Sequence, residues 1–350
     1  MTSSAKRREH PDVPPRFNPF ADDPPPKTPY EVASEHRLFR LRHYEPAHRT
    51  PGRLPVVFAY SLFKRPYILD LIEQRSIVRS FLDRNFAVYM IDWHPPKASD
   101  AQHGLEDYVY DGIARAIDDV REREETAQVS LVGICLGGLL SLLYTALAPD
   151  RVARLVQVAV GVERHRYIPP IMIEQMISFF GNLPAWWISG AINSRVPAAP
   201  QLPEFLAKEF DEPALADGSA AWKALYARMG QWLGSDVPLA GRLAREILCD
   251  IYWEGQLADG SLRIGGDRVE LKRVNAPILN ISGARDRLVP PQNTASLVDR
   301  VGSSYARNLV FPASHIGLLG AQAAHEDLWP RIGAWIKLFD AHATFSSLAP

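Results

Sequence analysis

The sequence has little cysteine and no excess of charge of either sign. Its 350 residues contain two cysteines, Cys135 and Cys249, which is too few for a disulfide-stabilised scaffold. Neither is part of a Cys-x-x-Cys pair, so redox and zinc motifs of that type are absent. The 39 basic and 40 acidic residues leave a formal net charge of -1. A polybasic nucleic-acid or membrane binder is therefore excluded, and a reducing, cytoplasmic compartment is expected.

Apolar runs that would target or anchor a chain are also missing. The basic N-terminus (Lys6-Arg7-Arg8) is followed by polar, proline-rich sequence, so no secretory signal is expected. Residues 126–149 carry no charge and are long enough to span a bilayer. However, this segment opens with β-branched residues, has Gly133, Gly137 and Gly138 at its middle, and turns helix-like only afterwards. A strand, a tight turn and a buried helix fit better than a transmembrane span.

What the sequence does have is a repeated alternation of short apolar runs and longer amphipathic segments. With 47% apolar residues it can bury a large core. The runs expected to be strands are residues 54–60, 86–92, 129–132, 155–160, 277–281 and 308–311. The clearest helix is 107–125, with Asp107 placed to cap its start. This order predicts an α/β fold with a mostly parallel sheet covered by helices on both faces.

The composition also predicts how the chain is divided. Residues 1–30 hold eight prolines and few aliphatic residues and are predicted to be a disordered tail. The alternation stops after residue 160, so we expect a core of residues 31–163 and 273–340, a largely helical cap at 164–272, and a C-terminal tail at 341–350. Within the cap, residues 167–194 carry a single charge, Glu174. The whole insertion is either an ordinary helical subdomain that buries its own core or a cap with an apolar channel or partner-binding face.

A candidate nucleophile lies where a predicted strand meets a helix. Gly133-Ile134-Cys135-Leu136-Gly137-Gly138 matches the G-x-S-x-G pattern with cysteine in place of serine. A nucleophile on a sharp turn crowds the neighbouring backbone, so the flanking positions need glycine, while the following amide and the helix N-terminus face a developing oxyanion. Taken alone, the pattern also fits a buried structural cysteine.

A thiol nucleophile needs a base and an acid, which in this kind of fold follow it in the order acid, histidine. Four histidines follow the turn: His165, His315, His325 and His342. His315 comes after a strand-like run and a turn, whereas the others suit surface or structural positions. Asp286 follows the strand-like run 277–281. The remaining aspartates considered fall within the insertion and fit less well: Asp211, Asp217, Asp236, Asp250, Asp259 and Asp267. The predicted catalytic residues are therefore Cys135, Asp286 and His315, each at the C-terminal end of a strand.

The remaining motifs indicate no cofactor and no metal. Cys249 lies in a predicted helix with no glycine turn around it and is expected to be a packed thiol. Metal-ligand spacings are absent. Gly260, Gly265 and Gly266 form no phosphate-binding pattern, because no strand-to-helix turn surrounds them.

Over residues 29–339 the chain resembles the catalytic subunit of polyhydroxyalkanoate synthase, particularly the short class III type. The resemblance rests on the glycine-flanked cysteine and on these further motifs: Arg65-Pro66-Tyr67-Ile68-Leu69-Asp70, Val88-Tyr89-Met90-Ile91-Asp92-Trp93, Met229-Gly230-Gln231-Trp232, Asp236-Val237-Pro238, Asp286-Arg287-Leu288-Val289-Pro290-Pro291 and Ser314-His315-Ile316-Gly317. It implies an α/β-hydrolase fold in which Cys135 is acylated, His315 is the base and Asp286 is the third member.

Two loops depart from the family's pattern. The family usually carries Thr-Pro-x-Asp-Phe where this chain has residues 159–163, ending in Glu163 and followed by Arg164-His165-Arg166. Its histidine loop usually opens with Gly-Gly-His, whereas here Ser314 precedes His315. We expect these changes to affect substrate range and activity more than fold.

The resemblance implies polymerisation of (R)-3-hydroxyacyl-CoA, with 3-hydroxybutyryl-CoA foremost, into a hydrophobic polyester with release of CoA. The oxyanion would be held by the amide of Leu136 and one from the loop 60–63, for which Leu62 is the candidate. A second accessory subunit, a homodimer or hetero-oligomer, and a place at the surface of cytoplasmic polymer granules are also implied. Two alternatives stay open. One is a cysteine hydrolase or other acyltransferase acting on a small ester, thioester or lactone, and the other is a catalytically silent granule subunit.

Overall fold

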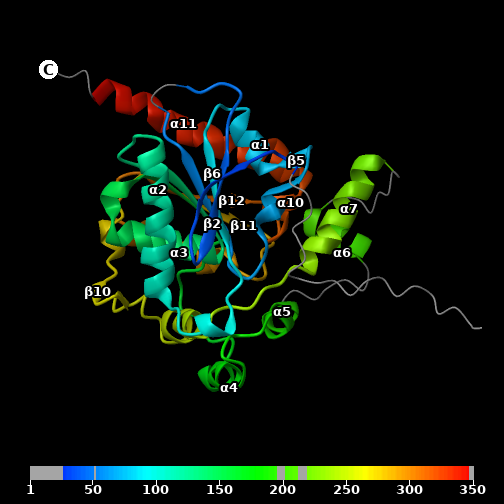
Figure 1. Ribbon diagram of the computed structural model, residues 1–350, viewed down its shortest axis with the longest axis vertical. Helices are drawn as coiled ribbons and strands as arrows, with labels where there is room; N and C mark the ends of the chain where they lie inside the picture. Colours follow the sequence, from blue (N-terminus) through cyan, green and yellow to red (C-terminus); the bar gives the residue numbers. More distant parts are fainter. Residues whose placement is uncertain (1–26, 51–52, 195–201, 212–218, 347–350) are drawn as a thin grey trace, which may run out of the picture.

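An eight-stranded sheet forms the centre of the molecule (Figure 1). The computed structural model describes residues 27–50, 53–194, 202–211 and 219–346. In spatial order the strands are β1 (Glu31–Glu35), β2 (Phe39–Tyr44), β6 (Val88–Trp93), β3 (Val56–Ala59), β7 (Val129–Ile134), β8 (Val152–Val158), β11 (Ile278–Gly283) and β12 (Ala306–Phe311). Strands β6 to β12 pair in parallel, while β2 pairs antiparallel with both β1 and β6. The predicted mostly parallel α/β sheet is confirmed.

The N-terminal hairpin β1–β2 is the part of the sheet that was not predicted. All six predicted strands are present, with ends shifted by up to three residues. The β2 sequence carries charged residues that hid it: Arg42 is buried in the sheet and forms an ion pair with Asp92 of β6, with Nη2 2.5 Å from Oδ2. A buried arginine is tolerated only with such a partner, and the sequence alone does not reveal one.

Helices cover both faces of the sheet. On one face α1 (Ile77–Leu82) and α11 (Trp329–Ser346) share a core with β3 and β6. On the other lie a π-helix, η3 (Asp107–Ala114), with its continuation α2 (Arg115–Arg123), and α3 (Leu136–Leu147). Strands β7 and β8 are enclosed between these layers, which explains why nearly all of their residues are buried.

The helix predicted at 107–125 begins earlier than its predicted cap. Its first turn starts at Leu105, and the Asp107 carboxylate accepts a hydrogen bond from the Gly104 amide at 2.8 Å. Asp107 therefore accepts the hydrogen bond of a free amide from within the first turn of the helix. It is not the N-cap residue that precedes the helix. The prediction had the right residue at the helix start but the wrong position for it.

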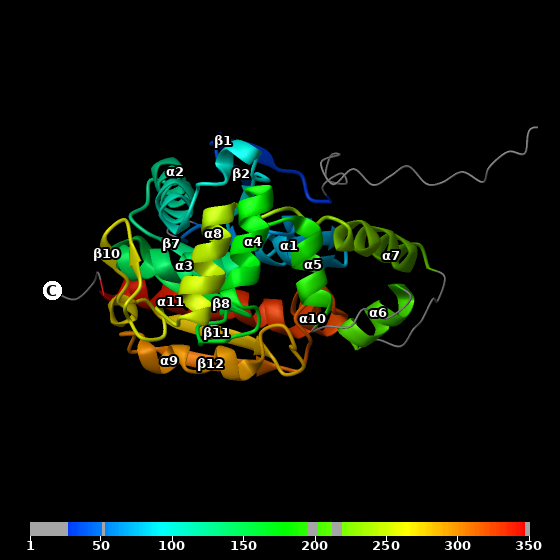
Figure 2. The same ribbon diagram turned by 90° about the horizontal axis from the view of Figure 1, so that it is seen from below.

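The segment between β8 and β11 is largely helical. It contains α4 (Pro170–Phe180), α5 (Ala185–Asn193), α6 (Leu202–Phe210), α7 (Ala220–Leu233), α8 (Gly241–Arg245) and the π-helix η5 (Glu246–Trp253). Figure 2 shows α4, α5 and α8 lying across one side of the molecule, with α6 and α7 extending to its edge. The segment then returns to the core through η6 (Leu271–Arg273), which packs against α3. The name cap is kept for residues 164–272, whose boundaries stay a prediction.

Short elements complete the described chain. They are η1 (Pro66–Leu69), β4 (Asp70–Ile72), β5 (Arg75–Ser76), η2 (Ala98–Asp100), η4 (Pro149–Arg151), β9 (Arg263–Ile264), β10 (Asp267–Arg268), η7 (Pro291–Asn293), α9 (Leu297–Arg300), α10 (Gly317–Gly320) and η8 (Ala324–Leu328). None of the helices within the described ranges is both long and apolar enough to cross a bilayer. The charge-free run 126–149 is instead β7, the cysteine turn and the buried α3.

Both predicted tails overlap ordered structure at their inner ends. The amides of Lys27 and Thr28 donate to Asp70 Oδ2 at 3.1 and 2.7 Å, and the Tyr30 ring packs on that of Tyr44. Backbone contacts therefore begin before the boundary predicted at residue 30. At the other end, α11 continues to Ser346, beyond the boundary predicted at 340. Residues 1–26 and 347–350 lie outside the described chain.

Candidate active site

Cys135 stands on a strained turn between β7 and α3. Its backbone has φ 53° and ψ -126°, a conformation that costs a residue other than glycine of the order of 1–3 kcal/mol and is found at functional sites. The flanking glycines make the turn sterically feasible. A Cβ on Gly133 would lie 2.4 Å from the Gly138 Cα, and one on Gly138 would lie 2.2 Å from a Val160 methyl carbon. The glycine spacing in the sequence thus has a direct steric cause.

His315 and Asp286 form a hydrogen-bonded pair at the carboxyl ends of neighbouring strands. Asp286 follows β11 and His315 follows β12, and His315 Nδ1 is 2.7 Å from Asp286 Oδ2. The other carboxylate oxygen accepts hydrogen bonds from the amides of Leu288 and Val289 at 2.9 and 2.7 Å. The carboxylate is fully buried, so its orientation is fixed by these bonds. It in turn fixes the imidazole ring with Nε2 free to act.

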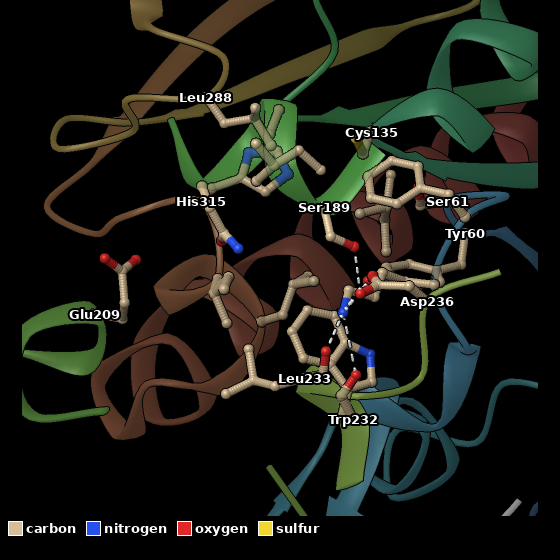
Figure 3. Close-up of a pocket in the computed structure, with 18 of the residues that line it drawn as sticks. Tyr60, Ser61, Cys135, Ser189, Glu209, Trp232, Leu233, Asp236, Leu288 and His315 are labelled. Atoms are coloured by element: carbon tan, nitrogen blue, oxygen red, sulfur yellow. Dashed lines mark hydrogen bonds and ion pairs between the residues drawn. The ribbon is translucent and has the colours of Figure 1, made fainter. Parts of the chain in front are cut away.

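The environment of His315 favours its charged form. Burial disfavours the imidazolium, but the charge and hydrogen bond of Asp286, together with a hydrogen bond to Cys135 and its charge, outweigh burial and hold the pKa of His315 well above its ordinary value. The three residues predicted from sequence are therefore brought together, and Figure 3 shows Cys135 and His315 at the same cavity. A cysteine and a histidine in one cavity suit nucleophilic catalysis.

The two predicted oxyanion donors differ in how well the structure supports them. Leu136 is the first residue of α3, so its amide is one of the free amides at the helix N-terminus. Leu62 lies in the loop after β3, but its side chain is buried in the core, and the cavity is lined by its neighbours Tyr60, Ser61 and Phe63. Its amide as a donor stays a prediction.

The cavity that contains Cys135 and His315 has a polar wall that the sequence did not reveal. Its volume is about 320 Å³. On this wall Lys64 Nζ lies 2.6 Å from Asp236 Oδ1, and the Ser189 hydroxyl donates to Asp236 Oδ2 at 2.5 Å. From the sequence, Asp236 fits the acid of the triad less well than Asp286, because it falls within the insertion. The one available signal was its place in the Asp236-Val237-Pro238 motif.

A second, larger cavity is also lined by Cys135. It has a volume of about 580 Å³ and shares Phe63, Cys135, Ala159, Ile192 and Leu288 with the first. Among the described residues that line it there is no Lys, Arg, Asp or Glu, and aromatic side chains such as Trp186, Trp187 and Tyr167 contribute to its walls. The nucleophile thus lies where a cavity with charged side chains on one wall meets a cavity whose described lining has none.

Comparison with known proteins places this geometry in a family. The α/β-hydrolase fold family matches residues 55–321. The poly(3-hydroxyalkanoate) polymerase subunit PhaC of Thiocystis violacea is 30% identical, with 87% of each chain covered, and that of Allochromatium vinosum is 30% identical with the same coverage. The chain belongs to the poly(3-hydroxyalkanoate) polymerase PhaC family. The resemblance drawn from its motifs is confirmed.

The chain is shorter than some members of this polymerase family. It is 32% identical to the PhaC subunit of Haloferax mediterranei over 88% of its own length but covers 64% of that protein. Solved structures show the fold alone. A monoacylglycerol lipase from Paleococcus ferrophilus superposes with a TM-score of 0.52 at 17% identity, covering 85% of this chain and 98% of the lipase. An enol-lactonase from Burkholderia xenovorans gives 0.53 at 15% identity, covering 90% and 100%.

The two departures from the polymerase family's motifs are engaged in packing contacts. Glu163 accepts hydrogen bonds from the Ser296 hydroxyl and from Arg300 Nη2, the latter at 2.7 Å. The Ser314 hydroxyl donates to the Glu209 carbonyl at 2.7 Å and accepts from the Gly317 amide at 3.0 Å. Ser314 therefore ties the histidine loop to α6 of the cap. These contacts give both side chains a structural role beside the site.

The other histidines are placed apart from the His315–Asp286 pair. His165 stacks between Tyr167 and Tyr252, with ring centroids 4.5 and 4.1 Å away, on the wall of the apolar cavity. His325 lies in η8, where burial and the nearby charge of Arg75 lower its pKa to about 4. His342 lies in α11, in a stretch whose side chains are not described.

Cys249 has the character expected of a packed thiol. It is buried in η5, and burial raises the pKa of its thiol to about 11, so it stays protonated at neutral pH. Within the described ranges, no group of three or more His, Cys, Asp and Glu side chains is placed to hold a metal ion.

Proposed function

We propose that the chain is an acyltransferase that polymerises (R)-3-hydroxyacyl units, foremost 3-hydroxybutyryl, from their CoA thioesters into a polyester with release of CoA. The observation that carries this proposal is a cysteine on a strained turn, in one cavity with a His315–Asp286 pair, in a chain of the PhaC family. On the same fold, a site of this kind with serine as the nucleophile suits ester cleavage. A sulfur nucleophile instead suits exchange between thioesters of similar energy.

In the first step the Cys135 thiolate attacks the substrate carbonyl carbon. The bond from that carbon to the cysteine sulfur forms, and the bond to the CoA sulfur breaks. His315 holds the proton taken from the cysteine thiol and delivers it to the departing CoA thiolate, while Asp286 keeps the imidazole in place. The tetrahedral oxyanion is stabilised by the amide of Leu136 at the start of α3 and by a second amide from the loop after β3. The products are an acyl-cysteine thioester and free CoA.

In the second step the 3-hydroxyl of another acyl unit attacks the acyl-cysteine. His315 accepts the hydroxyl proton, the oxygen-to-carbonyl bond forms, and the carbon-to-sulfur bond breaks, so the thiolate is regenerated beside the imidazolium. The chain grows by one ester linkage. Water would compete with the hydroxyl for the same thioester. The apolar cavity that meets Cys135 favours a polyester chain over water and thereby supports transfer over hydrolysis.

We infer that the enzyme works at the surface of its polymer product in the cytoplasm. Large apolar side chains are exposed on α4 and α5 of the cap, among them Phe179 at 82%, Trp186 at 63% and Ile171 at 58% exposure. Exposed patches of this kind mark interaction surfaces. A hydrophobic polyester carries no charges, so an apolar patch is the kind of surface that can bind it. The accessory subunit and the homodimer or hetero-oligomer stay predictions that follow from the resemblance.

The test is incubation with 3-hydroxybutyryl-CoA while free CoA and the form of the product are measured. We expect CoA release accompanied by insoluble polymer, and loss of both in Cys135→Ala. Cys249→Ala is the matched control, because it removes the other thiol away from the site and should retain activity. Free 3-hydroxybutyrate in place of polymer would point to the hydrolase alternative. Polymer formation that survives Cys135→Ala would show that this cysteine is not the working nucleophile.

A further inference from the structure

The side chain of Tyr60 lines the nucleophile cavity, and its hydroxyl group has no hydrogen-bond partner among the residues that the structure describes. Tyr60 follows β3, is 3% exposed and lines the same cavity as Cys135 (Figure 3). Its backbone carbonyl accepts a hydrogen bond from Trp93 Nε1 at 3.0 Å, but its phenol oxygen has no hydrogen bond to any described residue. Buried phenol groups normally have a hydrogen-bond partner. A ligand in the cavity can supply one.

The neighbours of this hydroxyl are already fixed by one another. Lys64 Nζ bonds to Asp236 Oδ1 and to the Leu233 carbonyl at 2.8 Å, and it lies 4.7 Å from the centre of the Trp232 ring. Ser189 of α5 holds the other Asp236 oxygen. This network joins the loop after β3 to the cap and gives the cavity one rigid polar wall. A few fixed polar groups in a mostly apolar site are what orient a ligand.

Tyr60 also lies close to both the nucleophile and this polar wall. Burial, and after it the charges of Cys135 and Asp236, hold the pKa of Tyr60 well above its ordinary value. The phenol therefore stays protonated at neutral pH and remains a hydrogen-bond donor.

We propose that Tyr60 recognises the 3-hydroxyl group of the acyl substrate by donating a hydrogen bond to its oxygen. This inference rests on the proposed function and deepens it, because it names the group by which the enzyme selects 3-hydroxyacyl thioesters over plain acyl thioesters. The substrate hydroxyl is two carbons away from the thioester carbonyl, so a carbonyl held at Cys135 brings it next to the wall that carries Tyr60. Ser189 and Asp236 offer acceptor oxygens on that wall for the hydroxyl hydrogen.

The experiment compares two substrates that differ only in this hydroxyl, (R)-3-hydroxybutyryl-CoA and butyryl-CoA. Butyryl-CoA can acylate Cys135 but cannot extend a chain, so CoA release in the first turnover measures acylation for both. We expect the wild-type enzyme to prefer the hydroxylated substrate in kcat/KM. Tyr60→Phe should lower kcat/KM for it by about tenfold or more, since an unpaired hydroxyl is costly to bury, and should leave butyryl-CoA within about twofold.

Tyr144→Phe is the matched control, because Tyr144 is a buried tyrosine on α3 that lines neither cavity. It should change neither rate. An equal loss for both substrates in Tyr60→Phe would overturn the inference, because it would mark a general positioning role. No loss for either, or no wild-type preference, would also overturn it. Absence of CoA release from both substrates in the wild-type enzyme would instead overturn the proposed function, and the inference with it.

Discussion

A Cβ atom on Gly137 would lie 2.3 Å from the carbonyl oxygen of Tyr60. The first turn of α3 therefore packs directly against the loop that follows β3. The predicted oxyanion site needs the amide of Leu136 and one amide of that loop on the same side of Cys135, and this close contact joins the two segments that carry them. Position 137 tolerates no side chain, because the atoms it would meet belong to backbone.

Gly137→Ala should strongly lower the kcat of acylation. The new methyl group must push α3 and the loop after β3 apart, and displacing one oxyanion donor costs about 10²–10³-fold in kcat. Gly230→Ala on α7 is the matched control, because this residue lines neither cavity and a Cβ there meets only the end of the Leu202 side chain, at 3.2 Å. It should leave kcat unchanged. Equal kcat values for the two variants would contradict the steric argument.

The three residues that we propose act on the substrate were predictable because backbone geometry constrains them locally. The glycines around Cys135 are required by contacts of 2.2 to 2.4 Å, and Asp286 and His315 follow strands that could be recognised as apolar runs. Each of these signals lies within a few residues of sequence. Local steric rules and strand order were enough to bring the three residues together in prediction.

The polar wall and the N-terminal hairpin could not be predicted, because both depend on pairing between distant residues. Lys64 and Asp236 are 236 - 64 = 172 positions apart in sequence. They meet only when the cap folds over the loop after β3. Arg42 in β2 looks like a surface residue until Asp92 is placed beside it. A buried charge is stable only with its partner, and a single sequence does not reveal which distant residue that is.

Cys135→Gly should be more stable than Cys135→Ala, although both lack the nucleophile. At a φ of 53° alanine retains the backbone strain, whereas glycine adopts such a conformation freely. Strain of this kind costs about 1–3 kcal/mol. We therefore expect the free energy of unfolding, measured in urea, to be about 1 kcal/mol higher for Cys135→Gly than for Cys135→Ala. In the interior of an ordinary helix, glycine in place of alanine instead lowers the free energy of unfolding. A lower stability for the glycine variant would show that the turn is not strained.

The stability contributed by the His315–Asp286 pair should decrease as the pH rises. Folding raises the pKa of His315, because the charge and hydrogen bond of Asp286 and the contact with Cys135 outweigh burial. A histidine with a raised pKa adds stability that is fully present below its unfolded pKa of about 6.5 and is lost as the pH rises through the folded value. Asp286→Asn removes the main cause of the shift. The difference in unfolding free energy between wild type and Asp286→Asn should therefore be largest at pH 6 and smaller at pH 9.

Urea denaturation of both proteins across this range measures that difference. Asp259→Asn is the control, because it removes a carboxylate that pairs with Arg164 at 2.8 Å and not with a histidine. Arginine keeps its charge throughout the range, so the Asp259→Asn difference should stay constant from pH 6 to pH 9. If the Asp286→Asn difference is equally constant, or grows with pH, the folded protein does not hold His315 as an imidazolium. The charged pair would then not be the resting state of the site, and His315 would have to act as a neutral base.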